Sequence, residues 1–187
     1  MCKRLFDIIL SFIVLALTAI PILLIYILIK ATSKGPALYW SDRVGRQNNI
    51  FKMPKFRSMR IDTPEVATHL LSNSKDYITP IGAFLRKTSL DELPQLISIL
   101  KGDMSFVGPR PALYNQHDLI KLRTENLVHT LVPGVTGWAQ INGRDEISIQ
   151  EKVKYDSYYL KNQTLILDFK IIWATFFKVL KQEDVSH

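Results

Sequence analysis

A stretch of 22 residues without a charged side chain, from Ile8 to Ile29, dominates the N-terminal part of the sequence. As an α-helix it would be about 33 Å long, which is enough to cross the hydrocarbon core of a bilayer. The sequence therefore predicts a membrane element, and the total of 187 residues suits this element plus one further domain.

Two features of this stretch bear on whether it crosses the membrane. Pro21 lies inside it and should kink a helix there. Basic residues flank it on both sides, namely Lys3, Arg4, Lys30 and Lys34. The positive-inside tendency would keep both flanks in the cytoplasm. A re-entrant helix that returns to the face it entered satisfies both features, and a kinked single span is the alternative that the residues alone leave open.

Charge and cysteine content narrow the classes of partner. The net charge of +7 favours ligands with phosphate groups or an anionic membrane surface. No recognition-helix, zinc-finger or RNA-binding pattern is present, so we expect no nucleic-acid partner. Cys2 is the single cysteine, and the four histidines are scattered, which argues against a disulfide framework or a cysteine-based metal site.

Asp91 and Glu92 form an adjacent carboxylate pair in front of a helical apolar spacing. Two helix starts are compatible with the sequence. Ser89 and Glu92 would form a capping box, but that start places Pro94 at the fifth helical position, at a cost of about 3 kcal/mol. A start at Asp91 places Pro94 in the first turn, and we favour it. Both carboxylates would then lie at a helix N-terminus, which favours their ionised forms.

The motif Gly108-Pro109-Arg110-Pro111 follows this helix. Two prolines present Arg110 rigidly, which suits bidentate contact with a phosphate group. Gly108 allows another backbone to approach closely. A carboxylate pair beside a fixed guanidinium indicates phosphate chemistry, whereas isolated N-terminal acids would usually be structural.

Several other segments carry predictions. A basic stretch includes Lys55 and Arg57, and a solvated strand is its alternative interpretation. The glycine-rich segment 133–144 indicates either ligand binding or a tight loop around a buried tryptophan. Thr79-Pro80 and the capping box from Ser148 to Glu151 should each begin a helix. Segment 164–181 resembles an amphipathic helix that lies on a membrane or packs on the core.

Three motifs carry a family resemblance: S-L-D-E-L-P-Q-L, K-G-D-M-S-F-V-G-P-R-P and P-G-V-T-G-W-A-Q-I-N-G-R. Together they resemble the bacterial sugar transferases, specifically the small PglC-like polyprenyl-phosphate phosphoglycosyl transferases. The resemblance implies a mostly helical α/β monotopic membrane protein. Residues 1–34 would form a re-entrant membrane helix, and residues 35–187 a catalytic domain with surface amphipathic helices. This domain would lie at the cytoplasmic face of the bacterial inner membrane. One departure is Ile20, where relatives often carry serine before the proline.

The same resemblance implies a reaction. A sugar phosphate would pass from a UDP-sugar, N-acetylated as in UDP-diacetylbacillosamine, to undecaprenyl phosphate, and UMP would be released. Asp91 would act as the nucleophile and form a covalent intermediate. Glu92 would serve as a general base or a metal ligand, and both carboxylates would hold Mg²⁺.

The resemblance also implies which side chains bind substrate: Lys55, Arg57, Arg110, Gln140 and Arg144. Two rival functions remain at the level of sequence, a membrane-anchored nucleotide-sugar hydrolase and a basic membrane-tethered binding protein. The sequence does not identify the sugar, and it leaves a homodimer open.

The re-entrant arrangement can be tested at Cys2, the single thiol of the chain. A membrane-impermeant thiol reagent is expected to label Cys2 in inside-out vesicles but not in intact spheroplasts. Pro21→Leu should straighten the helix and move part of the labelling to spheroplasts. Labelling of wild-type Cys2 from the outside of spheroplasts would rule out the re-entrant helix and support the kinked span.

Overall fold

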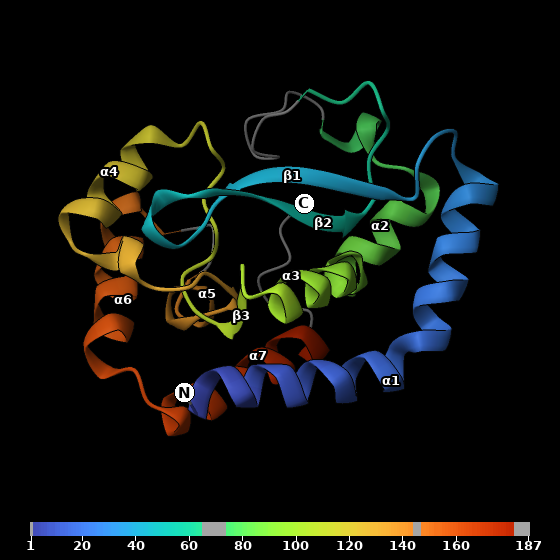
Figure 1. Cartoon of the computed structure of the whole chain (residues 1–187). Coiled ribbons are helices and arrows are strands. Elements are labelled where there is room, and N and C mark those ends of the chain that lie inside the picture. Colours follow the sequence, from blue (N-terminus) through green and yellow to red (C-terminus); the bar gives the residue numbers. More distant parts are fainter. Residues whose placement is uncertain (1, 65–73, 144–146, 182–187) are drawn as a thin grey trace.

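The computed structural model describes residues 2–64, 74–143 and 147–181, and Figure 1 shows its arrangement. The α-helices are α1 (Cys2–Thr32), α2 (Pro80–Lys87), α3 (Leu96–Lys101), α4 (His117–Glu125), α5 (Trp138–Ile141), α6 (Ile149–Asn162) and α7 (Leu165–Lys181). The strands are β1 (Leu38–Val44), β2 (Ile50–Phe56), β3 (Ser105–Val107) and β4 (Gly134–Thr136). Short 3-10 helices are η1 (Arg46–Asn48), η3 (Ser74–Tyr77), η4 (Leu90–Gln95) and η5 (Val128–Thr130). The expectation of a mostly helical protein with a long apolar N-terminal helix is confirmed.

Helix α1 is bent into two arms, which Figure 1 shows along the bottom and the right-hand edge of the molecule. Pro21 lies inside the helix and explains the bend, because proline lacks an N–H and clashes with the preceding turn. Asp7 and Ser11 are buried on the first arm, and Ile25 and Ile29 on the second. The remaining apolar side chains of α1 are largely exposed, so the helix is compatible with membrane anchoring. A re-entrant helix and a kinked span can both accommodate such a bend.

Polar side chains fix the first arm of α1 to the domain. Arg4 donates to the last carbonyls of α3, with a distance of 2.7 Å from Nη2 to the oxygen of Leu100. A cation at that position stabilises a helix C-terminus. Asp7 accepts hydrogen bonds from the Ser105 hydroxyl and the Phe106 amide, each at 3.1 Å. The first arm is therefore attached to α3 and β3 by more than apolar packing.

An ion pair between the partly exposed Lys3 and the fully buried Asp168 joins the start of α1 to α7. Lys3 Nζ lies 2.6 Å from Asp168 Oδ2, and the Tyr159 hydroxyl donates to Asp168 Oδ1 at 2.6 Å. The Tyr159 hydroxyl also lies 3.2 Å from the Val107 carbonyl. Burial raises the pKa of Tyr159, and the adjacent Asp168 carboxylate raises this pKa further. The phenol therefore stays a hydrogen-bond donor at the end of β3.

The strands form two separate pairs among the described residues. Strands β1 and β2 are antiparallel, with Leu38 opposite Phe56. Strands β3 and β4 are parallel, with Ser105 opposite Gly134. Strand β2 lies against η4. Gly108, which follows β3, donates its N–H to the Thr136 carbonyl at the end of β4 at 2.9 Å.

The predicted helix starts are confirmed at two places and wrong at a third. The Thr79 hydroxyl accepts from Gly82 N at 3.1 Å, and the Ser148 capping box is complete. The helix that carries Asp91 and Glu92, however, begins as the 3-10 helix η4 at Leu90, with Ser89 at the N-cap position and Pro94 inside, so the favoured start at Asp91 is wrong. Ser89 has φ 56° and makes no side-chain cap, so the alternative capping box is also absent at this described residue.

Replacement of Asp168 by alanine tests the attachment of α1. Lys3 and Tyr159 would both lose a buried partner, and the loss of one member of a buried pair costs about 3–5 kcal/mol. We expect a large fall in the thermal unfolding temperature of the detergent-solubilised protein. Asp42→Ala is the matched control, because Asp42 pairs with Lys52 at the surface, where such a pair contributes about 0–1 kcal/mol. An equal fall in unfolding temperature in the two variants would contradict the role of Asp168 in attaching α1.

Candidate active site

Three segments meet at the Asp91–Glu92 dyad, the adjacent carboxylates at the start of η4. Lys55 on β2 places Nζ 2.8 Å from Glu92 Oε1 and 3.9 Å from Asp91 Oδ2. Arg110 Nη2 lies 3.1 Å from the same Glu92 oxygen. Asp91 is only 8% exposed. The structure therefore brings together four of the residues predicted from the sequence, namely Asp91, Glu92, Lys55 and Arg110.

The loop that carries Arg110 is fixed through its backbone. The carbonyl of Pro109 accepts from Gly134 N at 2.9 Å, and that of Pro111 accepts from Arg43 Nη1 at 3.2 Å. The predicted close approach at Gly108 is confirmed, since a Cβ atom there would lie 2.3 Å from the Val132 carbonyl oxygen. No larger residue fits at this position without a shift of the backbone.

A buried ion pair supports the same loop from behind. Arg123 on α4 donates to the Arg110 carbonyl at 2.8 Å, while its Nη2 lies 2.7 Å from Asp156 Oδ2 on α6. Both side chains are almost fully buried. The Arg110 guanidinium is thus held at the dyad by a backbone that has little freedom to move.

The pKa values of the two carboxylates of the dyad are shifted in opposite directions. Burial alone would raise the pKa of Glu92, but the charges of Lys55 and Arg110, and the hydrogen bonds from both, hold this pKa far below its ordinary value. Burial raises the pKa of Asp91, the charge of Glu92 raises it further, and Lys55 opposes the shift. Glu92 is therefore a permanent anion that is already paired, and Asp91 is the more basic carboxylate.

Two further cations at the dyad were missed by the sequence reasoning. Burial and the nearby charge of Arg110 lower the pKa of Arg43 to about 10, and Glu92 opposes this shift. Burial also lowers the pKa of Arg86, which interacts electrostatically with Asp91. Arg43 lies on β1 and Arg86 on α2, so no spacing along the chain connects either residue with the carboxylates.

Arg57, Gln140 and Arg144, the other predicted substrate-binding residues, differ in their placement. Arg57 is buried at the C-terminal end of α1, where its Nη2 donates to the Ser33 hydroxyl at 2.7 Å. Gln140 lies on α5 in a cleft beside Glu92. Arg144 lies outside the described residues.

This cleft, which we call the Glu92 cleft, has a volume of about 220 Å³ and lies between the first arm of α1, η4 and α7. Its apolar lining includes Val14, Phe106, Val135, Ile141 and Val179. Its polar lining includes Glu92, Arg110, Thr136, Gln140, Thr175 and Lys178. Both side-chain amide atoms of Gln140 are buried and have no hydrogen-bond partner among the described residues.

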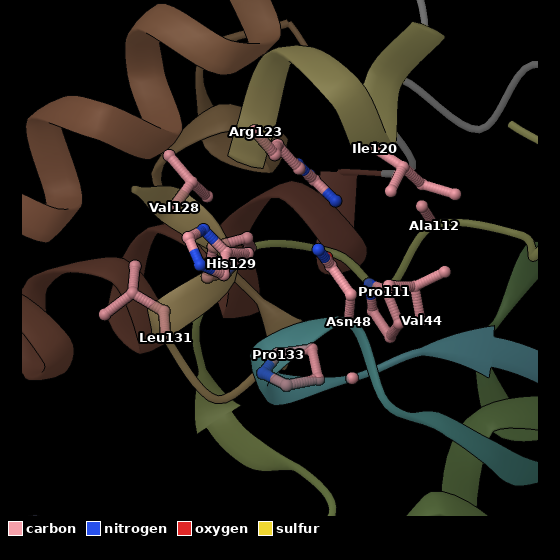
Figure 2. Close-up of a pocket in the computed structure, with 12 residues that line it drawn as sticks. Val44, Asn48, Pro111, Ala112, Ile120, Arg123, Val128, His129, Leu131 and Pro133 are labelled. Atoms are coloured by element: carbon pink, nitrogen blue, oxygen red, sulfur yellow. The ribbon is translucent and has the colours of Figure 1, made fainter. Parts of the chain in front are cut away.

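A second hollow lies behind the Arg110 loop, and Figure 2 shows its lining. Arg123 and His129 approach it from one side, and Asn48 approaches from the connection between β1 and β2. It encloses about 30 Å³, room for about two water molecules, so it has no space for a substrate.

The dyad offers at most a partial site for a metal ion. The described part of the chain contains no group of three or more His, Cys, Asp and Glu side chains placed to hold a metal. Mg²⁺ in phosphoryl-transfer sites, however, is commonly bound by one or two carboxylates together with the substrate phosphates. Asp91 and Glu92 fit that second arrangement.

The raised pKa of Asp91 predicts that this residue destabilises the fold when it is ionised. Between its ordinary pKa and the raised one the folded state binds more protons, so stability falls as pH rises through that range and stays low above it. In EDTA at neutral pH, Asp91→Asn should therefore unfold at a higher temperature than the wild type. The difference should vanish below pH ~4, where Asp91 is protonated in both states. A variant less stable than the wild type at neutral pH would contradict this assignment.

Comparisons with known proteins identify relatives of the whole chain. Residues 1–182 match the family model described as "Bacterial sugar transferase". An undecaprenyl-phosphate galactose phosphotransferase of Salmonella typhimurium is 42% identical over 199 residues, which cover 97% of this chain and 41% of that protein. A UDP-glucose:undecaprenyl-phosphate glucose-1-phosphate transferase of Escherichia coli is 39% identical over 94% of this chain and 39% of its own length.

Another relative matches over nearly its whole length. The uncharacterized sugar transferase EpsL of Bacillus subtilis is 40% identical over 98% of this chain and 90% of its own length. The chain thus corresponds to part of the longer transferases and to most of EpsL. The match to the family model over residues 1–182, together with these relatives, shows that the chain belongs to the bacterial sugar transferase family.

Proposed function

We propose that this chain transfers a sugar phosphate from a UDP-sugar to undecaprenyl phosphate and releases UMP. The observation that carries the proposal is the Asp91–Glu92 dyad, set among basic side chains beside a long apolar helix. In the described residues, Lys55, Arg110, Arg43 and Arg86 act on these two carboxylates, so positive charge is in surplus. Such a surplus suits a diphosphate. The Salmonella and E. coli relatives carry undecaprenyl phosphate in their names, which supports the same acceptor here.

The proposed reaction has two displacement steps at one phosphorus atom. A carboxylate oxygen of Asp91 attacks the β-phosphorus of the donor, the bond from this phosphorus to the bridging oxygen breaks, and UMP leaves with the electron pair. A phosphate oxygen of the acceptor then attacks the same phosphorus, and the Asp91 carboxylate leaves. Neither attacking group has to lose a proton when it is ionised. The more basic carboxylate of the dyad thus serves as the nucleophile.

Glu92 takes a different role in this proposal. Its depressed pKa makes it a poor general base, whereas its ion pairs hold Lys55 and Arg110 in place. These two cations would stabilise charge on the phosphate oxygens as it develops. The ion pairs of Glu92 would thus place both cations correctly before the substrate binds.

Mg²⁺ is part of the proposal as a bound cofactor. Asp91 and Glu92 would hold it together with the donor diphosphate, and it would neutralise charge on the phosphate oxygens. Removal of divalent cations with EDTA should abolish turnover, and added Mg²⁺ should restore it.

The arrangement of α1 supports the re-entrant topology, with the site at the cytoplasmic face of the membrane. Arg4 on the first arm contacts α3, and Ile29 on the second arm packs in one cluster with Phe56 and Leu85. Both arms therefore attach to the same domain. A span that crosses the bilayer, even a kinked one, would have to pull one of the two arms away from the domain. A charged donor and a lipid acceptor could then meet at one interface.

The direct test of this function is UMP release across a panel of UDP-sugars. The panel should include UDP-glucose and UDP-galactose beside N-acetylated donors such as UDP-diacetylbacillosamine, each with and without undecaprenyl phosphate. A transferase should sustain turnover only when the acceptor is present. Sustained release without acceptor would indicate a nucleotide-sugar hydrolase. Absence of release with every donor would favour a membrane-tethered binding protein.

Arg110→Lys tests whether the fixed guanidinium matters beyond its charge. Lysine keeps the charge but cannot make the planar, two-pronged contact with phosphate. Loss of one transition-state contact of this kind costs about 10²–10³ in rate. We expect that loss in kcat. Lys52→Arg, an exchange at an exposed ion pair, should leave kcat unchanged. Near-wild-type kcat in Arg110→Lys would mean that Arg110 acts only as a point charge.

A further inference from the structure

The Glu92 cleft separates two helices that are joined at one end. Near the start of α1, the rings of Phe6 and Phe169 lie 5.0 Å apart, and the Lys3–Asp168 ion pair closes the same junction. Further along the same helices, Val14 of α1 and Val179 of α7 line the cleft together. The two helices thus enclose the cleft between them beyond their junction. Figure 1 shows them along the same lower edge of the molecule.

Both helices present apolar side chains to the outside. On α1, Phe12 is 62% exposed and Leu17 is 76% exposed. On α7, Trp173 is 66% exposed and Phe176 is 54% exposed. An exposed apolar surface of this extent marks a membrane or protein contact. The cleft therefore lies directly behind the surface that would contact lipid.

The cleft is too small for either complete substrate, and its largely apolar lining favours a part of the lipid. At about 220 Å³ it is smaller than the ~300–1,000 Å³ of pockets that enclose drug-sized ligands, so a complete UDP-sugar does not fit in it. It has room for a phosphate group and the beginning of a hydrocarbon chain. Glu92 is the member of the dyad that lines the cleft. Asp91, Lys55 and Arg86 are not among the described residues of its lining.

The polar end of the cleft matches a phosphate group. Arg110 and Lys178 bring positive charge to it, and the apolar side chains lie along the rest of its wall. The Gln140 amide is buried there with no partner in the described structure, and an unmatched buried amide is costly unless a ligand completes its hydrogen bonds. Thr136 and Thr175, by contrast, satisfy each other through a 2.7 Å hydrogen bond.

We infer that the Glu92 cleft binds the phosphate and first isoprene units of the acceptor lipid, which enters between α1 and α7. The Gln140 amide donates to the acceptor phosphate. This inference rests on the proposed function for the identity of the lipid, but the site itself follows from the cleft.

A photoreactive prenyl phosphate with a diazirine near its phosphate tests the site without any need for turnover. The wild-type protein in lipid nanodiscs should be labelled on the segments around Val14, Val135 and Val179, and excess undecaprenyl phosphate should prevent the labelling. The corresponding prenyl alcohol should label these segments weakly. Labelling confined to outward residues such as Leu17 and Phe176 would overturn the inference.

Gln140→Glu tests the polar end of the same site, because a carboxylate there would repel the acceptor phosphate. The KM for undecaprenyl phosphate should rise by at least about tenfold, while the KM for the UDP-sugar stays the same. Gln150→Glu is the matched control, since it makes the same change at an exposed position on α6. Gln140→Leu removes the amide at a similar side-chain size and adds no buried charge, so it is less prone to a folding defect. It should also raise the KM for undecaprenyl phosphate.

The outcomes separate the two proposals. Labelling of the cleft without turnover on any UDP-sugar would leave the lipid site standing and reject the proposed reaction. Turnover with an unchanged acceptor KM in Gln140→Glu, or with labelling elsewhere, would reject the lipid site and leave the reaction standing.

Discussion

The ion pairs of Glu92 are the interaction on which the rest of the site depends. One carboxylate oxygen accepts from both Lys55 and Arg110, so a single partly buried anion joins β2, η4 and the Arg110 loop. Removal of Glu92 would take the shared partner from both cations, and with it the contact that fixes their positions. The same pairing keeps Glu92 ionised and leaves Asp91 as the more basic carboxylate. The ion pairs of Glu92 therefore hold the site together and, in the proposed reaction, leave Asp91 as the nucleophile.

The membrane helix and the site are connected through a short chain of contacts. Lys3 pairs with Asp168, Asp168 binds the Tyr159 hydroxyl, and this hydroxyl lies beside the Val107 carbonyl at the start of the Arg110 loop. Asp7 holds the backbone of β3 one residue earlier. The first arm of α1 thus serves as a wall of the catalytic domain as well as an anchor. A charged donor and a lipid acceptor could therefore reach the same dyad at one interface.

The sequence predicted what depends on local spacing. The kink-forming Pro21, the capping box at Ser148 and the close backbone approach at Gly108 all follow from short-range rules. The family resemblance predicted that Lys55 and Arg110 would bind substrate together with the carboxylates. Arg43 and Arg86 could not be found in this way, because tertiary packing alone brings β1 and α2 to the carboxylates. The Glu92 cleft could not be predicted either, since its walls come from α1, η4 and α7, which are far apart in the chain.

Asp91 as the nucleophile and Glu92 as the anion that positions the cations are roles that a covalent adduct tests most directly. The wild type should be incubated with a UDP-sugar that supports UMP release, without acceptor, and then digested and mapped by mass spectrometry. The account predicts one sugar-phosphate adduct, on Asp91, which undecaprenyl phosphate removes. Glu92→Gln should still form this adduct, more slowly, and Asp91→Asn should form none. An adduct on Glu92, or equal labelling of Asp91→Asn, would contradict the account.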